Sequence, residues 1–314
     1  MIVIGKSKLD ALLASGNKMK ALVTGGAGFI GSHIVDALIS RGDDVICVDD
    51  ESAPQNSAFY WNEKASNFMC DIRSIDRSLY EGVDVVFHLA ARSRIQPTIN
   101  SPSECFSVNV LGTQEVLESS RISGVKRVVY SASSSYYGHA SKPPFKESAP
   151  KGCATPYSLS KWQGEELCDL YTRLYSLSTV SLRYFNVYGP REPLKGEYAP
   201  VMGLFKRQRD AGQPLTIIGD GEQRRDFTHI ADVVRANLLA ALLPDVTGPI
   251  NIGTGKNYSI NQLAEMIGGP KINLPERVGE TRSTLADVSR ARNELSWAAE
   301  INLIDYINEK SLKF

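Results

Sequence analysis

The sequence has few cysteines and histidines, and neither type is spaced for a shared function. Its five cysteines are odd in number and include no CxxC pair, which argues against a disulfide framework and indicates reduced thiols in the cytoplasm. Its four histidines are equally dispersed, so the sequence predicts no metal site. The scattered residues are Cys47, Cys70, Cys105, Cys153, Cys168, His33, His88, His139 and His229.

An excess of charge of either sign is also missing. The 35 Lys and Arg residues balance the 35 Asp and Glu residues, so no global field attracts nucleic acid or an anionic membrane. No apolar run is long enough for a transmembrane span, and the apolar run within residues 1–18 is too short for a signal peptide. We therefore expect no nucleic-acid or membrane partner. Residues 1–18 form an N-terminal extension without an assigned role, because Met19 begins the first expected strand.

A glycine-rich turn between an apolar strand and a helix is present near the start of the chain. In KALVTGGAGFIGSHIVDALISRGDDVICVDD, Gly25, Gly28 and Gly31 follow the strand, and they allow a tight turn, close approach of backbone to a pyrophosphate, and close helix-to-strand packing. Asp49 ends the next strand, where a carboxylate would bond an adenosine ribose and repel a 2′-phosphate. The turn therefore predicts NAD rather than NADP, with a non-binding α/β protein as the alternative.

The same alternation of strands and helices continues along the chain. Residues 83–91 and 125–133 are continuous apolar runs suited to buried parallel strands, with a helix expected over 109–122 between them. A later strand is expected at 179–189 and a short one at 249–255. The pattern predicts an α/β fold with a doubly wound, mainly parallel Rossmann sheet.

Beyond residue 189 the composition becomes richer in Gly, Pro and Arg. This change indicates a smaller, partly discontinuous C-terminal domain that binds the substrate at the strand ends. We expect an NAD-binding domain over residues 19–185 and 228–253, and a second domain over 186–227 and 254–314.

Tyr157 and Lys161 lie four residues apart in TPYSLSKWQGEEL, directly after Pro156. Residues four apart share one helix face, so the ammonium of Lys161 would approach the phenol of Tyr157 and favour its ionised form. A phenolate near neutral pH is a usable base. An amphipathic helix with a packed tyrosine and a solvated lysine is the ordinary alternative, and the spacing alone does not decide between them.

A series of further motifs surrounds this pair. In chain order, they are TGGAGFIGSH, VDD, CDI, FHLAA, NVLGT, YSASSSYYG, PYSLSK, RYFNVYGPR, GDGEQRRDF, NIGTG and LADVSRA. From about Lys20 to Trp297 the sequence thereby resembles the extended short-chain dehydrogenase/reductase family, specifically its NAD-dependent nucleotide-sugar epimerases and dehydratases. One such motif can arise by chance, but the ordered series favours the catalytic interpretation of Tyr157 and Lys161.

The resemblance implies a role for each member of a catalytic group. Tyr157 would be the base, Lys161 its electrostatic partner and a ligand of the cofactor ribose, and Ser133 the hydroxyl that bonds the reacting sugar oxygen. A positive nicotinamide and Lys161 would both lower the pKa of the phenol, which could then take a proton from a sugar 4-hydroxyl. The run SASSS also contains Ser131, Ser134 and Ser135 as alternatives to Ser133.

The resemblance also implies contacts with NAD and with the nucleotide sugar. Asp71 could equally cap the end of a strand, and Arg224 competes with its neighbour Arg225, whose guanidinium fork suits a diphosphate. The implied cofactor residues are Gly25, Gly28, Phe29, Ile30, Gly31, Asp49, Asp50, Asp71, Ile72, Leu89, Ala90, Asn109, Tyr157, Lys161 and Tyr184. The implied substrate residues are Ser133, Asn186, Arg225, Arg277 and Thr284.

The residues directly after Ser133 bear on the reaction. Family dehydratases carry an Asp-Glu pair there, and the decarboxylating relatives usually keep a Glu, whereas this sequence has Ser134 and Ser135. Hydroxyls with a pKa far above neutrality cannot replace carboxylates as acid and base. Epimerisation needs only the tyrosine, the lysine, the cofactor and room for a transient 4-keto sugar to turn over. We therefore expect NAD-dependent 4-epimerisation of a UDP-sugar, with a 4,6-dehydratase as an alternative.

The sugar itself is less closely defined. In epimerases of this type a small residue just before the LAD motif widens the sugar pocket, and Thr284 holds that place. Both UDP-hexoses and UDP-N-acetylhexosamines are therefore expected substrates. UDP-glucuronate is a further alternative, with Arg92 or Arg94 as partner of its carboxylate.

Two expectations about assembly and class follow from the family. The helices over 109–122 and 156–175 commonly pair across a two-fold axis in it, which predicts a homodimer. Some members of the wider superfamily bind the dinucleotide only as sensors, usually after losing the tyrosine or the lysine. This sequence keeps both residues, so a non-catalytic sensor is the less favoured class.

Overall fold

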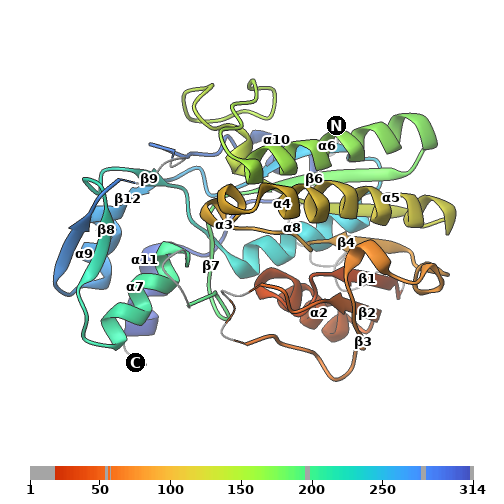
Figure 1. Cartoon of the computed structure of the whole chain (residues 1–314), viewed down its shortest axis with the longest axis horizontal. Coiled ribbons are helices and arrows are strands. Elements are labelled where there is room, and N and C mark those ends of the chain that lie inside the picture. Colours follow the sequence, from red (N-terminus) through yellow and green to blue (C-terminus); the bar gives the residue numbers. More distant parts are fainter. Residues whose placement is uncertain (1–17, 54–55, 57, 195–198, 277–280, 312–314) are drawn as a thin grey trace.

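The computed structural model of the chain describes residues 18–53, 56, 58–194, 199–276 and 281–311. A larger lobe is built around one central sheet, and a smaller lobe lies at the left of Figure 1. Residues 1–17, which make up most of the expected N-terminal extension, lie outside the described residues. No helix within the described ranges is long and apolar enough to cross a membrane.

The central sheet is wholly parallel. Its strand order is β11-β6-β5-β4-β1-β2-β3, and every neighbouring pair runs in the same direction. The predicted doubly wound α/β fold is therefore confirmed, and the order reverses between β1 and β4, where sheets of this kind bind ligands. The strands are β1 (Lys20–Thr24), β2 (Asp44–Asp49), β3 (Ser66–Met69), β4 (Val85–His88), β5 (Arg127–Ser133), β6 (Ser178–Tyr184) and β11 (Gly248–Ile252).

Among the described residues, three two-stranded sheets accompany the central one, two of them parallel and one antiparallel. They pair β7 (Val187–Tyr188) with β10 (Thr228–His229), β9 (Arg224–Arg225) with β12 (Tyr258–Ser259), and β8 (Leu215–Ile218) with β13 (Lys271–Leu274).

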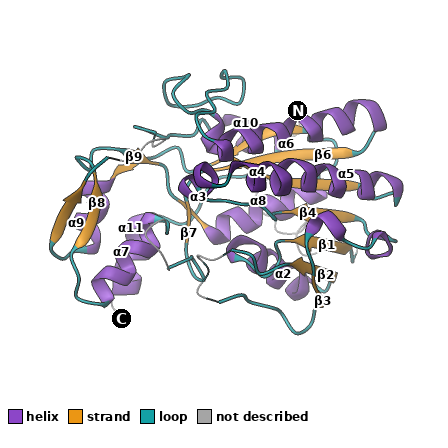
Figure 2. Ribbon diagram, viewed as in Figure 1, coloured by secondary structure: helices purple, strands orange, loops and turns teal. Residues whose placement is uncertain are grey.

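Helices lie on both faces of the central sheet, with α4, α5 and α6 on one side and α2 and α8 on the other (Figure 2). The α-helices are α2 (Phe29–Arg41), α3 (Ile95–Asn100), α4 (Pro102–Phe106), α5 (Gly112–Ile122), α6 (Pro156–Tyr175), α7 (Val201–Asp210), α8 (Ile230–Leu242), α9 (Ile260–Ile267), α10 (Ser289–Glu294) and α11 (Leu303–Ser311). Shorter helical turns are η1 (Ile72–Ser74), η2 (Arg77–Tyr80), η3 (Ser107–Leu111) and η4 (Ser134–Tyr136).

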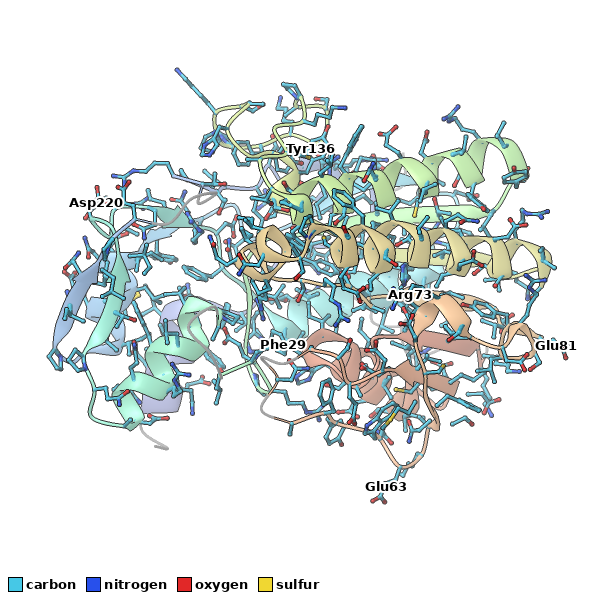
Figure 3. All side chains as sticks on the ribbon, in the orientation of Figure 1. Phe29, Glu63, Arg73, Glu81, Tyr136 and Asp220 are labelled. Carbon is cyan, nitrogen blue, oxygen red and sulfur yellow. The ribbon has the colours of Figure 1, made fainter. Side chains whose placement is uncertain are left out.

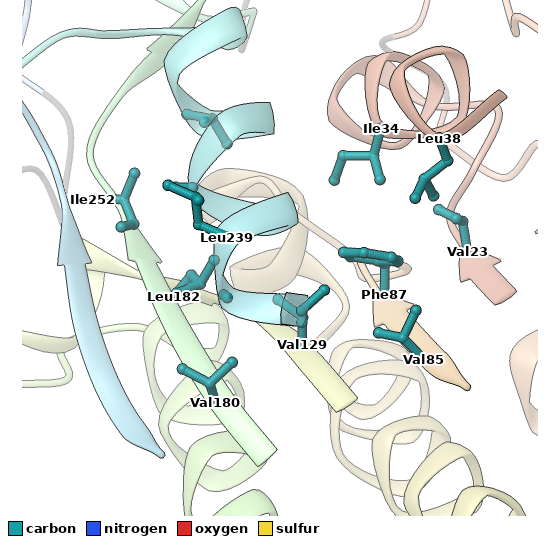
Figure 4. Close-up of a cluster of buried hydrophobic side chains, with 14 of the residues drawn as sticks. Val23, Ile34, Leu38, Val85, Phe87, Val129, Val180, Leu182, Leu239 and Ile252 are labelled. Atoms are coloured by element: carbon teal, nitrogen blue, oxygen red, sulfur yellow. The ribbon is translucent and has the colours of Figure 1, made fainter. Parts of the chain in front are cut away.

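Each face of the central sheet buries its own apolar core, because strands covered on both faces must be apolar on both. Figure 4 shows one core, in which Ile34 and Leu38 of α2 and Leu239 of α8 pack over Phe87 and Val129 of the sheet. The opposite core joins β5 to α5 and α6. Its members include Val116, Leu117, Val128, Tyr130, Cys168 and Tyr171.

A buried ion pair fixes α6 against the sheet. Arg183 of β6 donates from Nε and Nη2 to the carboxylate of Glu165, at 3.0 and 2.7 Å, and from Nη1 to the hydroxyl of Tyr137 at 2.9 Å. Removing one partner of such a pair costs about 3–5 kcal/mol, because the other charge stays buried. The pair therefore holds one face of α6 toward the ends of β5 and β6.

The smaller lobe has a separate apolar core, contributed by β7, β8, α7, α9 and α11. This core lies within residues 186–227 and 254–314 and so supports the proposed division of the chain. The same stretch also contains Ala291, Leu295 and Trp297, which pack into the core of the central sheet. We therefore propose that the division applies to the cores, with residues 291–299 packing against the larger lobe and α11 belonging to the smaller one.

Two expected elements are interrupted in the structure. The strand expected over 179–189 ends at Tyr184, because Asn186 adopts a φ of 29° that turns the chain out of the sheet. The helix expected over 109–122 begins with the π-helical turn η3 and continues as α5. Short π-helical segments often lie at functional sites, and both interruptions lie near the ends of the central strands.

Candidate active site

A cavity of about 520 Å³ extends from the glycine turn after β1, past the ends of β5 and β6, to the smaller lobe. In Figure 3, Phe29 lies at the end of α2 that faces the smaller lobe, and Asp220 lies at that lobe's outer end. The site residues predicted from the sequence that line the cavity are Gly25, Gly28, Phe29, Ile30, Gly31, Asp49, Asp50, Asp71, Ile72, Leu89, Ala90, Ser133, Tyr157, Lys161, Tyr184, Asn186, Arg225 and Thr284.

The glycine turn brings backbone close to backbone at this end of the cavity. Gly25 has a φ of +68°, and a Cβ there would lie 2.7 Å from the backbone nitrogen of Ala90. A Cβ on Gly31 would lie 2.1 Å from the carbonyl oxygen of Gly25. Gly28 precedes α2 and provides no side-chain cap, so the first N–H groups of the helix remain available to an anion. The turn therefore fits a dinucleotide pyrophosphate.

Asp49 and Asp50 follow at the end of β2. Asp49 is buried, and its carboxylate accepts hydrogen bonds from the backbone N–H of Ala27 at 3.1 Å and of Glu51 at 2.9 Å. Burial raises the pKa of Asp49, while these two hydrogen bonds lower it. Asp50 accepts hydrogen bonds from the backbone and hydroxyl of Ser52. Acceptor-only carboxylates at this edge fit the hydroxyl donors of a ribose.

Asp71 caps a helical turn and also lines the cavity. Its carboxylate caps η1 by accepting from the backbone N–H of Arg73 at 2.8 Å, and it pairs with the Arg73 guanidinium. The hydrogen bond with the side chain of Arg73 is the main cause that lowers the pKa of Asp71. The same residue lines the cavity, so the cap does not remove it from the site.

Asn109 is placed differently from the expected cofactor contact. It is buried in η3, is not among the cavity-lining residues, and holds the loop after β4 through bonds with the backbone of Arg92 at 2.7 and 3.1 Å. Its amide also donates to Ser160 of α6 at 2.9 Å. Asn109 therefore supports the cavity wall from behind. Arg277, the other expected residue that is not among the lining, lies outside the described residues.

Tyr157 and Ser133 meet where β5 ends and α6 begins. Thr155 caps α6 through a reciprocal pair of bonds with Ser158, and Pro156 occupies the first turn, so the start of the helix is defined locally. Ser133 interacts with the Tyr157 phenol and lowers its pKa, and it accepts from Ser135 at 2.9 Å. Of the four serines in the run, Ser133 is the one whose side chain acts on the pKa of Tyr157.

The pKa of Tyr157 differs from the sequence expectation. Burial raises it above the ordinary value, while the hydrogen bond with Ser133 and the charge of Arg94 lower it. The polypeptide alone therefore holds the phenol in its neutral form. Lys161, the expected source of the acidifying charge, donates from Nζ to the carbonyl oxygen of Ser131 at 2.7 Å.

Lys161 is itself perturbed by its surroundings. It is almost completely buried, and burial lowers its pKa to about 8, since desolvation disfavours the ammonium. Its Nζ also lies 4.9 Å from the centre of the Tyr130 ring. The lysine thus belongs to the floor of the cavity, one helical turn beyond Tyr157.

The far end of the cavity is built by the smaller lobe. Arg225 lines it, whereas Arg224 turns away and donates to the side chain and carbonyl of Asn257, both at 2.9 Å. Asn186 donates to the carbonyl oxygen of Asp226 at 2.9 Å and to the hydroxyl of Thr284 at 3.2 Å. The structure therefore brings Arg225, Asn186 and Thr284 to the same cavity.

Two acidic residues of this region were not singled out from the sequence. Asp226 is fully buried and accepts from the backbone N–H of Thr254, Gly255 and Ala286 at 2.8–3.1 Å, so it ties three loops together. Glu192 lines the cavity opposite Arg94. Asp226 lies in the sequence RRDF and Glu192 in GPREP. Neither motif shows which loops these carboxylates contact in the folded protein.

Comparisons with known proteins agree with this geometry. Residues 21–253 match the model of the family described as NAD dependent epimerase/dehydratase. The chain is 39% identical over 292 residues to a putative UDP-glucose 4-epimerase of Methanocaldococcus jannaschii, covering 90% of this chain and 94% of that protein.

Two solved structures are also similar along almost their whole length. A UDP-glucose 4-epimerase of Thermotoga maritima with UDP-glucose has a TM-score of 0.85 at 34% identity, covering 94% of this chain and 100% of that one. A UDP-N-acetylglucosamine 4-epimerase of Methanobrevibacter ruminantium has a TM-score of 0.88 at 32% identity, covering 95% and 98%. With the family model spanning most of its length and its glycine turn shaped for a dinucleotide, the chain belongs to the NAD dependent epimerase/dehydratase family, whose cofactor is NAD.

Proposed function

We propose that the protein catalyses NAD-dependent 4-epimerisation of a UDP-sugar, either a UDP-hexose or a UDP-N-acetylhexosamine, through a transient 4-keto sugar. The observation that carries the proposal is the meeting of Ser133, Tyr157 and Lys161 at one cavity with the glycine turn at its other end. One cavity can thus hold a dinucleotide and a sugar side by side, which a hydride exchange at C4 requires.

The residues of the chain divide the work between binding and proton transfer. The glycine turn and Asp49 would hold NAD, which supplies the capacity to accept a hydride from C4 and return it to the opposite face. The charge of a bound nicotinamide would oppose the effect of burial on the pKa of Tyr157, and its phenolate would then take the proton of the 4-hydroxyl and later return it, while Ser133 would orient the same oxygen. Arg225 and Asn186 would bind the diphosphate, so that the sugar ring can turn over while its nucleotide stays bound.

Elimination of water is less well supported by the lining of the cavity. Ser134 and Ser135 line it directly beside Ser133, at the places where the sequence resemblance puts the extra acid and base of a dehydratase. A neutral hydroxyl cannot serve as that acid-base pair near neutral pH. Thr284, a small residue in the wall, supports including UDP-N-acetylhexosamines among the proposed substrates.

A panel of UDP-, dTDP-, GDP- and CDP-sugars tests the function. We expect UDP-glucose or UDP-N-acetylglucosamine to give its C4 epimer, with unchanged mass and no net consumption of NAD, as read by chromatography and mass spectrometry. A product lighter by one water would identify a dehydratase instead. Binding of NAD without turnover of any sugar would point to a sensor.

A homodimer is proposed as the assembly. Apolar side chains that are largely exposed in the described chain follow α5 and α6 and support pairing through these helices. Replacing Leu174, the most exposed of these residues, with aspartate should convert a dimer into a monomer in light-scattering measurements. A monomeric wild-type protein would contradict the proposal. The exposed residues are Leu111, Ile122, Leu170, Leu174 and Tyr175.

The cytoplasm remains the predicted compartment. All five cysteines are free thiols in the structure, and a reducing compartment preserves thiols in that form.

A further inference from the structure

Ser135 contributes a hydroxyl to the cavity wall that the proposed reaction does not use. The residue is half-buried and lines the cavity together with Ser133 and Tyr157. Its hydroxyl donates to the Oγ of Ser133 at 2.9 Å, and its backbone N–H donates to the same oxygen at 3.2 Å. The Oγ of Ser133 therefore accepts two hydrogen bonds from a single neighbour.

These two hydrogen bonds limit how Ser133 can bond to any further group. A serine hydroxyl has one donor and two acceptor lone pairs. The backbone N–H and the hydroxyl of Ser135 occupy both lone pairs, so the proton of Ser133 is left for a third partner. Ser133 lowers the pKa of Tyr157, which is the effect of a donor that bonds the charged form of a phenol. Ser133 therefore faces Tyr157 as a donor.

The helical turn η4, which carries Ser135, is held from both sides. Ser133 caps the start of the turn, and the carbonyl oxygen of Tyr136 at its end accepts from the backbone N–H of Gly152 at 2.9 Å. The guanidinium of Arg183 lies 3.6 Å from the centre of the Tyr136 ring. The position of Ser135 relative to Ser133 is thus set by the backbone of the turn, and a group held in this way needs little reorganisation when a ligand binds.

Several other elements bring titratable or charged groups to Tyr157. These groups change its pKa through their charge, and they are present in addition to the effect of burial. None of them is a hydroxyl that the backbone turns toward the phenol, which is the contribution of Ser133 and its neighbour. The groups are Lys161 on α6 itself, Arg94 before α3, Cys105 of α4 and Tyr130 of β5.

We propose that Ser135 is a positioning residue, whose two hydrogen bonds hold Ser133 as a donor toward the Tyr157 phenolate and the 4-oxygen of the sugar. The inference rests on the proposed 4-epimerisation and adds a residue to it. A donor fixed toward an oxygen that gains negative charge stabilises that charge without reorganising. Ser133 and Ser135 both keep their protons, so the proton of the 4-hydroxyl still passes to Tyr157 and returns from it.

Ser135→Ala tests the inference, because it removes the hydroxyl and keeps the backbone N–H. One lone pair of Ser133 is then free to accept from the Tyr157 phenol, which favours the neutral form. We expect the ionisation midpoint of Tyr157 to rise by about 0.5–1 pH unit, the effect of one hydrogen bond. Since the base must be ionised to act, the acid limb of kcat should move to higher pH by the same amount. Ser135→Thr keeps the hydroxyl and should restore both values.

The midpoint is measured by the ultraviolet absorption of the phenolate in the NAD-bound enzyme without a sugar. Subtracting the spectrum of Tyr157→Phe removes the signal of the other tyrosines, and the titration does not depend on turnover. Ser134→Ala is the matched control. Ser134 lines the cavity on the same turn, and no hydrogen bond joins its hydroxyl to Ser133 in the described part of the chain. This variant should leave the midpoint of Tyr157 unchanged.

Three results would overturn the inference and leave the epimerase function intact. They are an unchanged midpoint in Ser135→Ala, an equal rise in Ser134→Ala, and a higher KM for the sugar with no shift of the acid limb. The last result would show that Ser135 binds the sugar directly. A raised midpoint in Ser135→Ala, in a protein that turns over no UDP-sugar, would support the positioning of Ser133 and count against the proposed function alone.

Discussion

Tyr157→Phe is expected to lower kcat for 4-epimerisation by at least ~10³-fold, because a positioned general acid-base group contributes about 10²–10⁴-fold and the phenyl ring offers no replacement. The ring remains the same size, so the packing of α6 and the binding of NAD should persist. Steady-state kinetics with a UDP-sugar measure the loss, and calorimetric titration of NAD checks that the cofactor site is intact.

Tyr175→Phe provides the control for this substitution. Tyr175 ends the same helix, is about half exposed, and is not among the residues that line the cavity. Its substitution should leave kcat near the wild-type value. A Tyr157→Phe enzyme that retains kcat within tenfold of wild type would show that another group removes the proton. Ser133 would then be the first residue to test, since it lines the cavity beside Tyr157 and lowers the pKa of the phenol.

Gly31→Ala is expected to weaken NAD binding by at least ~100-fold, since overpacking costs about 3 kcal/mol and here meets backbone rather than a movable side chain. The new Cβ would lie 2.1 Å from the carbonyl oxygen of Gly25 and 2.8 Å from the Cα of Gly26. The start of α2 must then move away from the turn, and the backbone N–H groups that would bind the pyrophosphate move with it. Calorimetric titration with NAD measures the change.

Gly28→Ala distinguishes a loss of pyrophosphate binding from a loss of folding. A Cβ at Gly28 would lie 3.3 Å from the carbonyl oxygen of Gly25, so the turn needs only a small adjustment, yet the methyl group would project beside the pyrophosphate position. We expect a folded protein with reduced NAD affinity. Ser40→Ala, at an exposed place on the same helix, should bind NAD normally. Wild-type affinity in Gly31→Ala would exclude the turn as the pyrophosphate site.

Most of the fold was predictable because it depends on local patterns. The helix over residues 156–175 is confirmed with the same bounds, since Pro156 and a capping residue mark its start. The glycine turn was identified from spacing, because only glycine tolerates the approach of Gly31 to Gly25. The strand expected over 179–189 was too long, since no local signal showed that Asn186 would take a left-handed conformation.

The sequence predicted which residues line the cavity better than it predicted the hydrogen bonds that these residues form. The spacing of Tyr157 and Lys161 places both on one helix face, yet it does not show that Lys161 binds the carbonyl oxygen of Ser131. The motif NVLGT predicts Asn109 as a cofactor contact, but it does not show that the side chain also holds the loop after β4. Each of these differences arises from a partner that is distant in sequence.

The βαβ alternation, the dinucleotide turn and the residue types of an acid-base reaction could be read from the chain, because they follow from periodicity, backbone tolerance and side-chain pKa. Only the folded protein shows that Arg225 rather than Arg224 lines the cavity and that Glu192 and Arg94 share its wall. Those outcomes depend on how loops from two lobes converge, and burial and charge at the point of convergence have no signature along the chain.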